Sequence, residues 1–192
     1  MDTNLPNLLT HSRVAFIPVL VIVFYVPFQY HLIAAAGIFT LASITDAIDG
    51  YVARRLGQIT QFGTFLDPVA DKLMVAVALI LLVERHDSLY FTLPASVIIG
   101  REIVISALRE WMAEIGKSAS VAVSYIGKVK TGLQMTAIVL LLAVDDILLF
   151  VPEAYSIWIF RFSYTLLYGA AILTLWSMIL YLRTAMREFD IK

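Results

Sequence analysis

Residues 45–72 read TDAIDGYVARRLGQITQFGTFLDPVADK and carry four aspartates, two arginines and one lysine. The chain on either side of them is strongly apolar. Of its 192 residues 60% are hydrophobic and only 15% are charged, and the mean hydropathy is +0.86. These values lie outside the range of soluble globular proteins. The composition predicts an integral membrane protein, in which the charge of residues 45–72 needs an explanation.

Apolar segments long enough to cross a bilayer, about 17 to 25 residues each, are separated by charged or turn-forming residues. Six such segments are expected to be transmembrane helices: residues 8–26, 31–55, 66–83, 89–109, 130–144 with several preceding residues, and 157–182. Pro27 and residues 84–88 and 145–153 are expected to break them. The connections are short and no cysteine is present, which excludes disulfides and thiol chemistry. The sequence predicts an all-α membrane protein with a single membrane-embedded domain over residues 1–192.

Basic residues indicate which side of the membrane holds residues 45–72, because Lys and Arg accumulate in cytoplasmic loops. If both termini are cytoplasmic, 12 of the 14 basic residues lie on that side, and only Arg85 and Arg161 lie outside. Lys72 and Arg101 fall within helices and weigh less in this count. The distribution still places residues 45–72 at the cytoplasmic face.

Helical geometry brings the aspartates of residues 45–72 into pairs. At 100° per residue, Asp46, Asp49, Gly50 and Ala53 share one face of the second helix. Asp67 and Asp71 are four residues apart at the start of the third helix, which is expected to begin just before Pro68. These spacings predict that two pairs of carboxylates from consecutive helices converge.

Four converging carboxylates repel one another in a partly dehydrated site unless protons or cations compensate them. A set of oxygen ligands without cysteine or histidine suits Mg²⁺ or Mn²⁺ and argues against zinc. Four carboxylates can hold two such ions, in a site that clamps a diphosphate. Gly50 and Ala53 let a ligand approach the helix closely, and Arg54 can bind phosphate oxygens.

The pattern Asp46-x-x-Asp49-Gly50-x-x-Ala53-Arg54, eight further residues, then Gly63-x-x-x-Asp67-x-x-x-Asp71 resembles the signature of the CDP-alcohol phosphotransferase family. A chance match at these eight positions is on the order of one in ten million. The resemblance implies a six-helix membrane domain, usually a homodimer, whose cytoplasmic cavity binds a CDP-linked lipid and two divalent metals. It implies metal ligation by the four aspartates and proton abstraction from the attacking hydroxyl by Asp71. It also implies a nucleotide site lined by Gly50, Ala53, Arg54 and Gly63.

The acceptor is indicated by GREIVISALREWMAEIGKSASVAVSYIGKVKTGLQ, residues 100–134, and by NLPNLLTHSR near the start. Both resemble the phosphatidylglycerophosphate synthase branch of that family, which joins CDP-diacylglycerol to glycerol 3-phosphate. Residues 100–134 hold five basic residues against three glutamates, an excess that suits an acceptor carrying its own phosphate. The residues predicted to bind that phosphate are Arg101, Arg109, Lys128 and Lys130.

Other interpretations remain open at this point. The aspartates could pair with basic residues only to hold helices together, and the basic residues of 100–134 could reflect topology and anionic headgroups. The alternative functions are a related enzyme with another acceptor, such as inositol phosphate, and an ion-coupled transporter, although no repeat appears. Trp158, Trp176, Tyr155, Tyr164 and Tyr181 are expected to be interfacial anchors or packing residues. The resemblance further implies a bacterial cytoplasmic membrane, lipids as partners and no nucleic acid.

Overall fold

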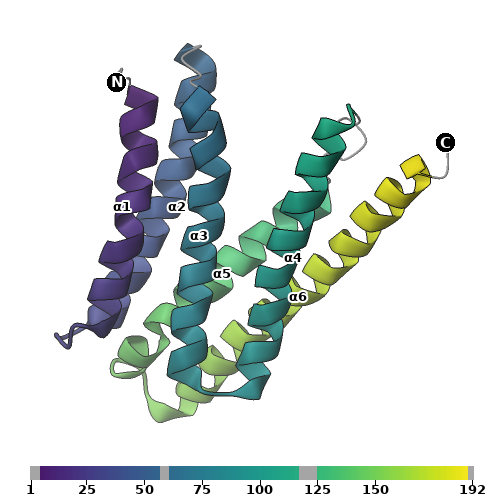
Figure 1. The fold of residues 1–192 in the computed structure, drawn as a ribbon. Helices are drawn as coiled ribbons and strands as arrows, with labels where there is room; N and C mark the ends of the chain where they lie inside the picture. The colour runs from purple at the N-terminus through teal and green to yellow at the C-terminus, as the bar shows by residue number, and fades with distance from the viewer. Residues whose placement is uncertain (1–4, 57–60, 117–124, 190–192) are drawn as a thin grey trace. The chain divides into compact units, whose positions relative to one another are not determined.

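The computed structural model describes residues 5–56, 61–116 and 125–189. Within them it describes all side chains except those of residues 5–13, 46–56, 61–68, 125, 126, 128, 153 and 187–189. All regular elements of the described residues are helices (Figure 1). They are α1 (Leu5–Tyr25), α2 (His31–Leu56), α3 (Gln61–His86), α4 (Leu89–Glu114), α5 (Tyr125–Leu148) and α6 (Glu153–Phe189). Each of the six predicted segments is therefore helical, which confirms the all-α class.

Several helices extend beyond their predicted bounds, and α3 also continues through residues 84–86 of an expected break. α3 begins at Gln61, so that Pro68 lies inside the helix rather than in its first turn. A later start was expected because proline is favoured in the first turn of a helix. α5 continues through Asp145 to Leu148, where the acidic residues were expected to end it. The Asp145 carboxylate is paired with Arg85, with 2.6 Å between Oδ2 and Nη2, which removes the reason for a break.

Helices that can cross a membrane are identified by length and composition. Among the described residues three qualify: Leu89–Glu114, Val129–Leu148 and Ala154–Met186. Val14–Tyr25 and His31–Thr45 are shorter apolar helices. Large apolar side chains on these and other helices are exposed, as expected where helices face lipid rather than water. The exact number of six spans stays a prediction.

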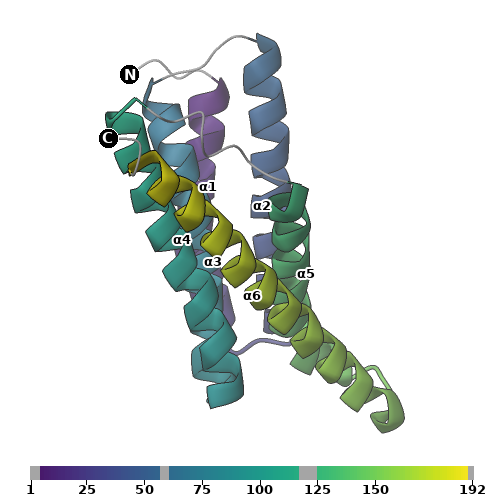
Figure 2. The ribbon, with the colours of Figure 1, turned by 90° about the vertical axis from the view of Figure 1, so that its right-hand side faces the viewer.

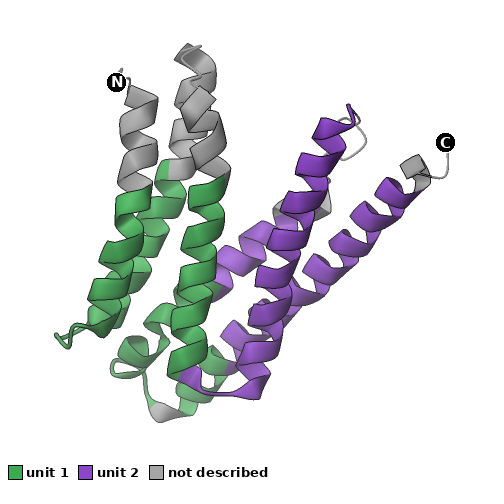
Figure 3. Cartoon of the chain, viewed as in Figure 1, with its two compact units in different colours: residues 1–85, 138–160 green, residues 86–137, 161–192 purple. Residues whose placement is uncertain are grey.

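The chain forms two compact units, residues 1–85 with 138–160 and residues 86–137 with 161–192 (Figure 3). In the first unit α2 packs against α1. The buried positions of α2 recur at helical spacing and are mostly small: Leu32, Ala35, Ala36, Phe39 and Ala42. Small side chains let two helix backbones approach closely, which suits packing inside a membrane. The single domain remains a prediction, because the division describes only the packing within each unit.

The second unit contains α4 and most of α6. Figure 2 shows α6 as one uninterrupted helix. The buried stripe of α4 is apolar except at one position: Phe91, Pro94, Ala95, Ile98, Arg101, Ile105 and Met112. The buried positions of α6 include the polar residues Ser163, Thr174 and Ser177. Thr174 donates a hydrogen bond to the Ala170 carbonyl in its own helix, 2.6 Å away. Arg101 is therefore a buried charge in an otherwise apolar stripe, and it needs partners from other helices.

Candidate functional site

The aspartates of the predicted metal site lie on two consecutive helices. Asp46 and Asp49 fall in the C-terminal half of α2, and Asp67 and Asp71 in the N-terminal half of α3. The helical spacing behind the prediction is therefore present in the backbone. The side chains of Asp46, Asp49, Gly50, Ala53, Arg54, Gly63 and Asp67 lie outside the described residues. Asp71 is described and is half-buried. Convergence of the four carboxylates stays a prediction.

The opposite end of α2 is held by Asp146 of α5. Its Oδ2 atom accepts hydrogen bonds from the backbone N–H groups of Leu32 at 2.9 Å and Ile33 at 3.0 Å. These donors have no partner inside the helix, and a carboxylate there also interacts favourably with the helix dipole. Asp146 is buried, with only 7% of its surface exposed, so these bonds are shielded from water. Asp146 was predicted from the sequence to lie where a helix ends. Its role as an anchor of the helix that carries Asp46 and Asp49 was not predicted.

The chemistry of the four predicted ligands fits a hard divalent cation, because all are carboxylates on helices joined by a short connection. No cluster of three or more His, Asp or Glu side chains that could hold a metal occurs among the described residues. Three of the four predicted ligands lie outside the described side chains, so their grouping is not tested.

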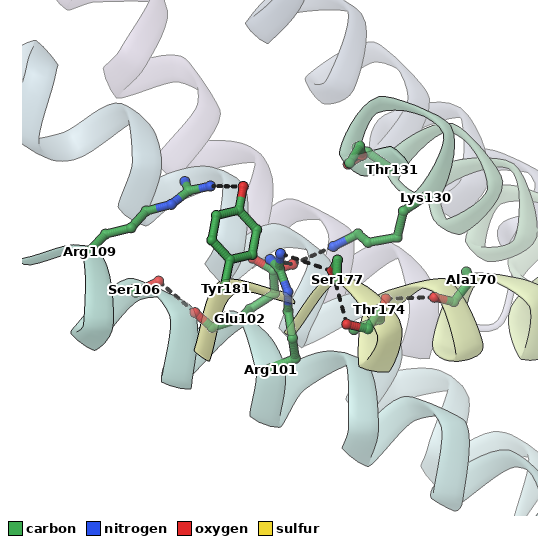
Figure 4. A network of polar contacts seen from close by, with 11 residues as sticks. Arg101, Glu102, Ser106, Arg109, Lys130, Thr131, Ala170, Thr174, Ser177 and Tyr181 are labelled. Atoms are coloured by element: carbon green, nitrogen blue, oxygen red, sulfur yellow. Dashed lines mark hydrogen bonds and ion pairs between the residues drawn. The ribbon is translucent and has the colours of Figure 1, made fainter. Parts of the chain in front are cut away.

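The basic residues predicted to bind the acceptor form a network in the second unit (Figure 4). Arg101 and Lys130 come from different helices, and both contact the Oε1 atom of Glu102. The distances are 3.2 Å from Arg101 Nη1 and 2.6 Å from Lys130 Nζ. Arg101 is 8% exposed and Lys130 4% exposed. Two buried cations thus share one carboxylate oxygen.

α6 supplies the neutral partners of this network. Arg101 donates from Nη2 to Ser177 Oγ at 3.3 Å, and Ser177 donates to the Thr174 carbonyl at 2.9 Å. Arg109 donates from Nη2 to the Tyr181 hydroxyl at 3.3 Å. Both guanidinium groups also lie over the Tyr181 ring, 5.6 Å from its centroid for Arg101 and 5.4 Å for Arg109. The negative face of an aromatic ring stabilises nearby cations, so Tyr181 helps to hold two arginines in place.

Charge in this network favours an added anion. Among the described residues, the largely buried Arg101 and Lys130 contact one carboxylate, that of Glu102, and a third cation, Arg109, lies over the same Tyr181 ring as Arg101. Buried charge without full compensation is costly, and a second anionic group lowers that cost. Phosphate suits guanidinium and ammonium donors because it offers several charged acceptors. The network is therefore chemically suited to a phosphate group.

Of the four residues predicted to bind the acceptor, the structure connects Arg101, Arg109 and Lys130, while the side chain of Lys128 lies outside the described residues. Sequence reasoning counted Glu102 only as an opposing charge and missed Ser177. It expected Tyr181 to be an anchor or a packing residue. Tyr181 does pack against the buried pair Met112 and Ala185, but it also contacts two arginines. The spacing of Thr174, Ser177 and Tyr181 on one face of an apolar helix was a signal for this polar face.

Comparison with known proteins identifies the family to which the sequence is similar. The model of the CDP-alcohol phosphatidyltransferase family matches residues 3–176. A protein of Salmonella choleraesuis (strain SC-B67) named CDP-diacylglycerol–glycerol-3-phosphate 3-phosphatidyltransferase is 53% identical over 185 residues, which is 96% of both chains. Proteins with the same name from Escherichia coli (strain K12) and Shigella flexneri serotype 5b (strain 8401) are 52% identical, again over 96% of both chains.

Proposed function

We propose that this chain, which belongs to the CDP-alcohol phosphatidyltransferase family, transfers the phosphatidyl group of CDP-diacylglycerol to glycerol 3-phosphate and releases CMP. The observation that carries this proposal is its similarity, over 96% of both chains, to proteins named for that reaction. The comparisons do not favour another acceptor or an ion-coupled transporter. The buried cations of the second unit support an acceptor that carries a phosphate.

The acceptor phosphate is proposed to bind at Arg101 and Lys130. Both side chains are buried, and together they carry more positive charge than Glu102 alone compensates. Arg109, held by Tyr181, is proposed to add a further contact, as is Lys128 on the sequence pattern alone. A neutral acceptor would leave these cations without an anion, so the network favours phosphorylated acceptors over serine or free inositol.

The donor is proposed to bind at the aspartates of α2 and α3. Asp46, Asp49, Asp67 and Asp71 would hold two Mg²⁺ or Mn²⁺ ions, which would supply positive charge to stabilise the leaving phosphate. Gly50, Ala53, Arg54 and Gly63 would line the nucleotide site.

In the proposed reaction Asp71 accepts the proton of the glycerol 3-phosphate 1-hydroxyl. The resulting oxygen attacks the phosphorus that bears diacylglycerol, and the bond from that phosphorus to the CMP oxygen breaks. The protein's contribution is mainly to orient two substrates and to match charge, as is general for phosphoryl-type transfer. The apolar, lipid-facing helices let CDP-diacylglycerol remain in the bilayer while its headgroup reacts.

The cellular setting is proposed on the same basis. The relatives are bacterial, and helices of this chain are long and apolar enough to cross a membrane, which fits the bacterial inner membrane. The distribution of basic residues supports cytoplasmic termini and a site that faces the cytoplasm, where a water-soluble acceptor arrives. The family resemblance supports a homodimer and a single catalytic domain.

An acceptor screen tests the proposed function. The purified protein in detergent micelles is given CDP-diacylglycerol and Mg²⁺, and glycerol 3-phosphate, inositol phosphate, serine or phosphatidylglycerol is added separately. CMP release and the lipid product are measured. Release of CMP with glycerol 3-phosphate alone, and its loss when the metal is chelated, is the expected result. Release with a different acceptor and none with glycerol 3-phosphate refutes the proposal.

A further inference from the structure

Gln134 of α5 is a buried polar residue that the proposed reaction does not yet use. It is 3% exposed, and its Oε1 atom receives no hydrogen bond from the described part of the chain. A buried carbonyl oxygen without a donor costs about 1–3 kcal/mol, so such atoms usually have an explanation in a native structure.

Its position relates it to the cationic network. Gln134 follows Lys130 by four residues in the same helix, so both side chains lie on one face of α5, one turn apart. Both are buried, and Lys130 reaches Glu102 of α4. Arg101 also has an unsatisfied polar atom, but here the donor lacks an acceptor. Its Nε–H is buried and donates no hydrogen bond within the described residues.

A missing acceptor at Arg101 and a missing donor at Gln134 define the ligand that would satisfy both. It needs anionic oxygens at one end, for the Nε–H of Arg101, and a hydroxyl group further along, for the Oε1 of Gln134. Lys130, which would bind the same anionic end, lies one helical turn from Gln134, about 5.4 Å along the helix axis, which is comparable to the length of a three-carbon phosphate ester. Glycerol 3-phosphate has both features.

We propose that Gln134 is a specificity-determining residue that accepts a hydrogen bond from the 2-hydroxyl of glycerol 3-phosphate while the phosphate lies at Arg101 and Lys130. This inference rests on the proposed function. The 2-hydroxyl is the group concerned because the 1-hydroxyl is the nucleophile and gives its proton to the base. A buried acceptor left unpaired by an analogue without the hydroxyl discriminates strongly against that analogue.

The test compares glycerol 3-phosphate with 3-hydroxypropyl phosphate, which lacks only the 2-hydroxyl. kcat/KM for each acceptor is measured by CMP release with the full-length protein, with Gln134→Met, which keeps the side-chain length without the amide, and with Gln134→Leu. Thr136→Val is the matched control, because Thr136 is exposed on the same helix and donates to the Gly132 carbonyl. We expect the wild type and Thr136→Val to prefer glycerol 3-phosphate by about tenfold or more. In the Gln134 variants the ratio should fall to about one.

The outcomes separate this inference from the proposed function. If the wild type uses neither acceptor, the proposed function fails. If it uses both equally well, the enzyme stands and the role of Gln134 is refuted, whether or not the variants fold. A preference that persists in Gln134→Met or Gln134→Leu also refutes it, and indicates that Oε1 serves only a structural water. Because each ratio is measured within one protein preparation, a loss of folded protein does not change it.

Discussion

Replacement of Lys130 by methionine separates acceptor binding from helix packing. The Lys130 ammonium is buried and contacts Glu102 Oε1 at 2.6 Å. A hydrogen bond from a charged group contributes about 1.5–3 kcal/mol. If Lys130 binds the acceptor phosphate, Lys130→Met should lower kcat/KM for glycerol 3-phosphate by about tenfold to 150-fold. KM for CDP-diacylglycerol should change little.

The same substitution should also destabilise the protein, because it leaves Glu102 with one cation instead of two. Breaking a buried ion pair costs about 3–5 kcal/mol. Glu102 is 23% exposed and keeps Arg101 at 3.2 Å, so we expect the lower end of that range. Glu102→Gln combined with Lys130→Met also removes the carboxylate that Arg101 contacts, and a buried guanidinium that loses its carboxylate partner is destabilising. The double variant should therefore be no more stable than Lys130→Met.

The assay measures thermal unfolding in detergent and acceptor kinetics for the single and double variants. Arg183→Gln is the control, since Arg183 is an exposed cation near the end of α6. We expect the double variant to unfold at or below the temperature of Lys130→Met, and its kcat/KM for glycerol 3-phosphate to stay low. If the double variant instead recovers the wild-type unfolding temperature and the wild-type kcat/KM, Lys130 acts only as the partner of Glu102, and the proposed acceptor site is wrong.

Substitutions at three further positions test other parts of the proposal. Tyr181→Phe keeps the ring and should change KM for glycerol 3-phosphate by less than about threefold. Tyr181→Leu removes two cation–π contacts and should raise that KM about tenfold. Equal effects of the two substitutions would contradict the role of the ring. Asp146→Ala removes the side chain that caps the N-terminus of α2 and should lower the free energy of unfolding by about 0.5–2 kcal/mol. Asp146→Asn should lower it by less, and thermal unfolding measures both effects. Asp71→Asn should lower kcat by about 10²–10⁴ if Asp71 is the base; CMP release near the wild-type rate would exclude that role.

The aspartate pattern and the helices could be predicted because they depend on local spacing. Asp46 and Asp49, three residues apart, fall in one helix, and apolar segments of suitable length mark where helices form. The ends of α3 and α5 were predicted less well. α5 continues past Asp145 because the carboxylate finds Arg85, which is 60 residues away in the chain.

The partners of the basic residues could not be predicted for the same reason. Composition indicated an excess of positive charge in residues 100–134 and a phosphate-bearing acceptor. It did not indicate that Arg101 and Lys130 share one oxygen of Glu102, or that Tyr181 lies against two guanidinium groups. The pairs that hydrogen bonds join between helices in this network are 28 to 76 positions apart in the sequence.

The amino-acid sequence by itself thus determined the class of protein, the helices, the family signature and the excess of positive charge in residues 100–134. Each of these follows from composition or from local spacing along the chain. Only the tertiary structure decided which side chains meet. Contacts between helices depend on how their buried faces pack, and neither helical period nor composition encodes that register. The buried cations at Arg101 and Lys130, the anchor at Asp146 and the Gln134 oxygen that has no donor among the described residues all belong to this second kind of information.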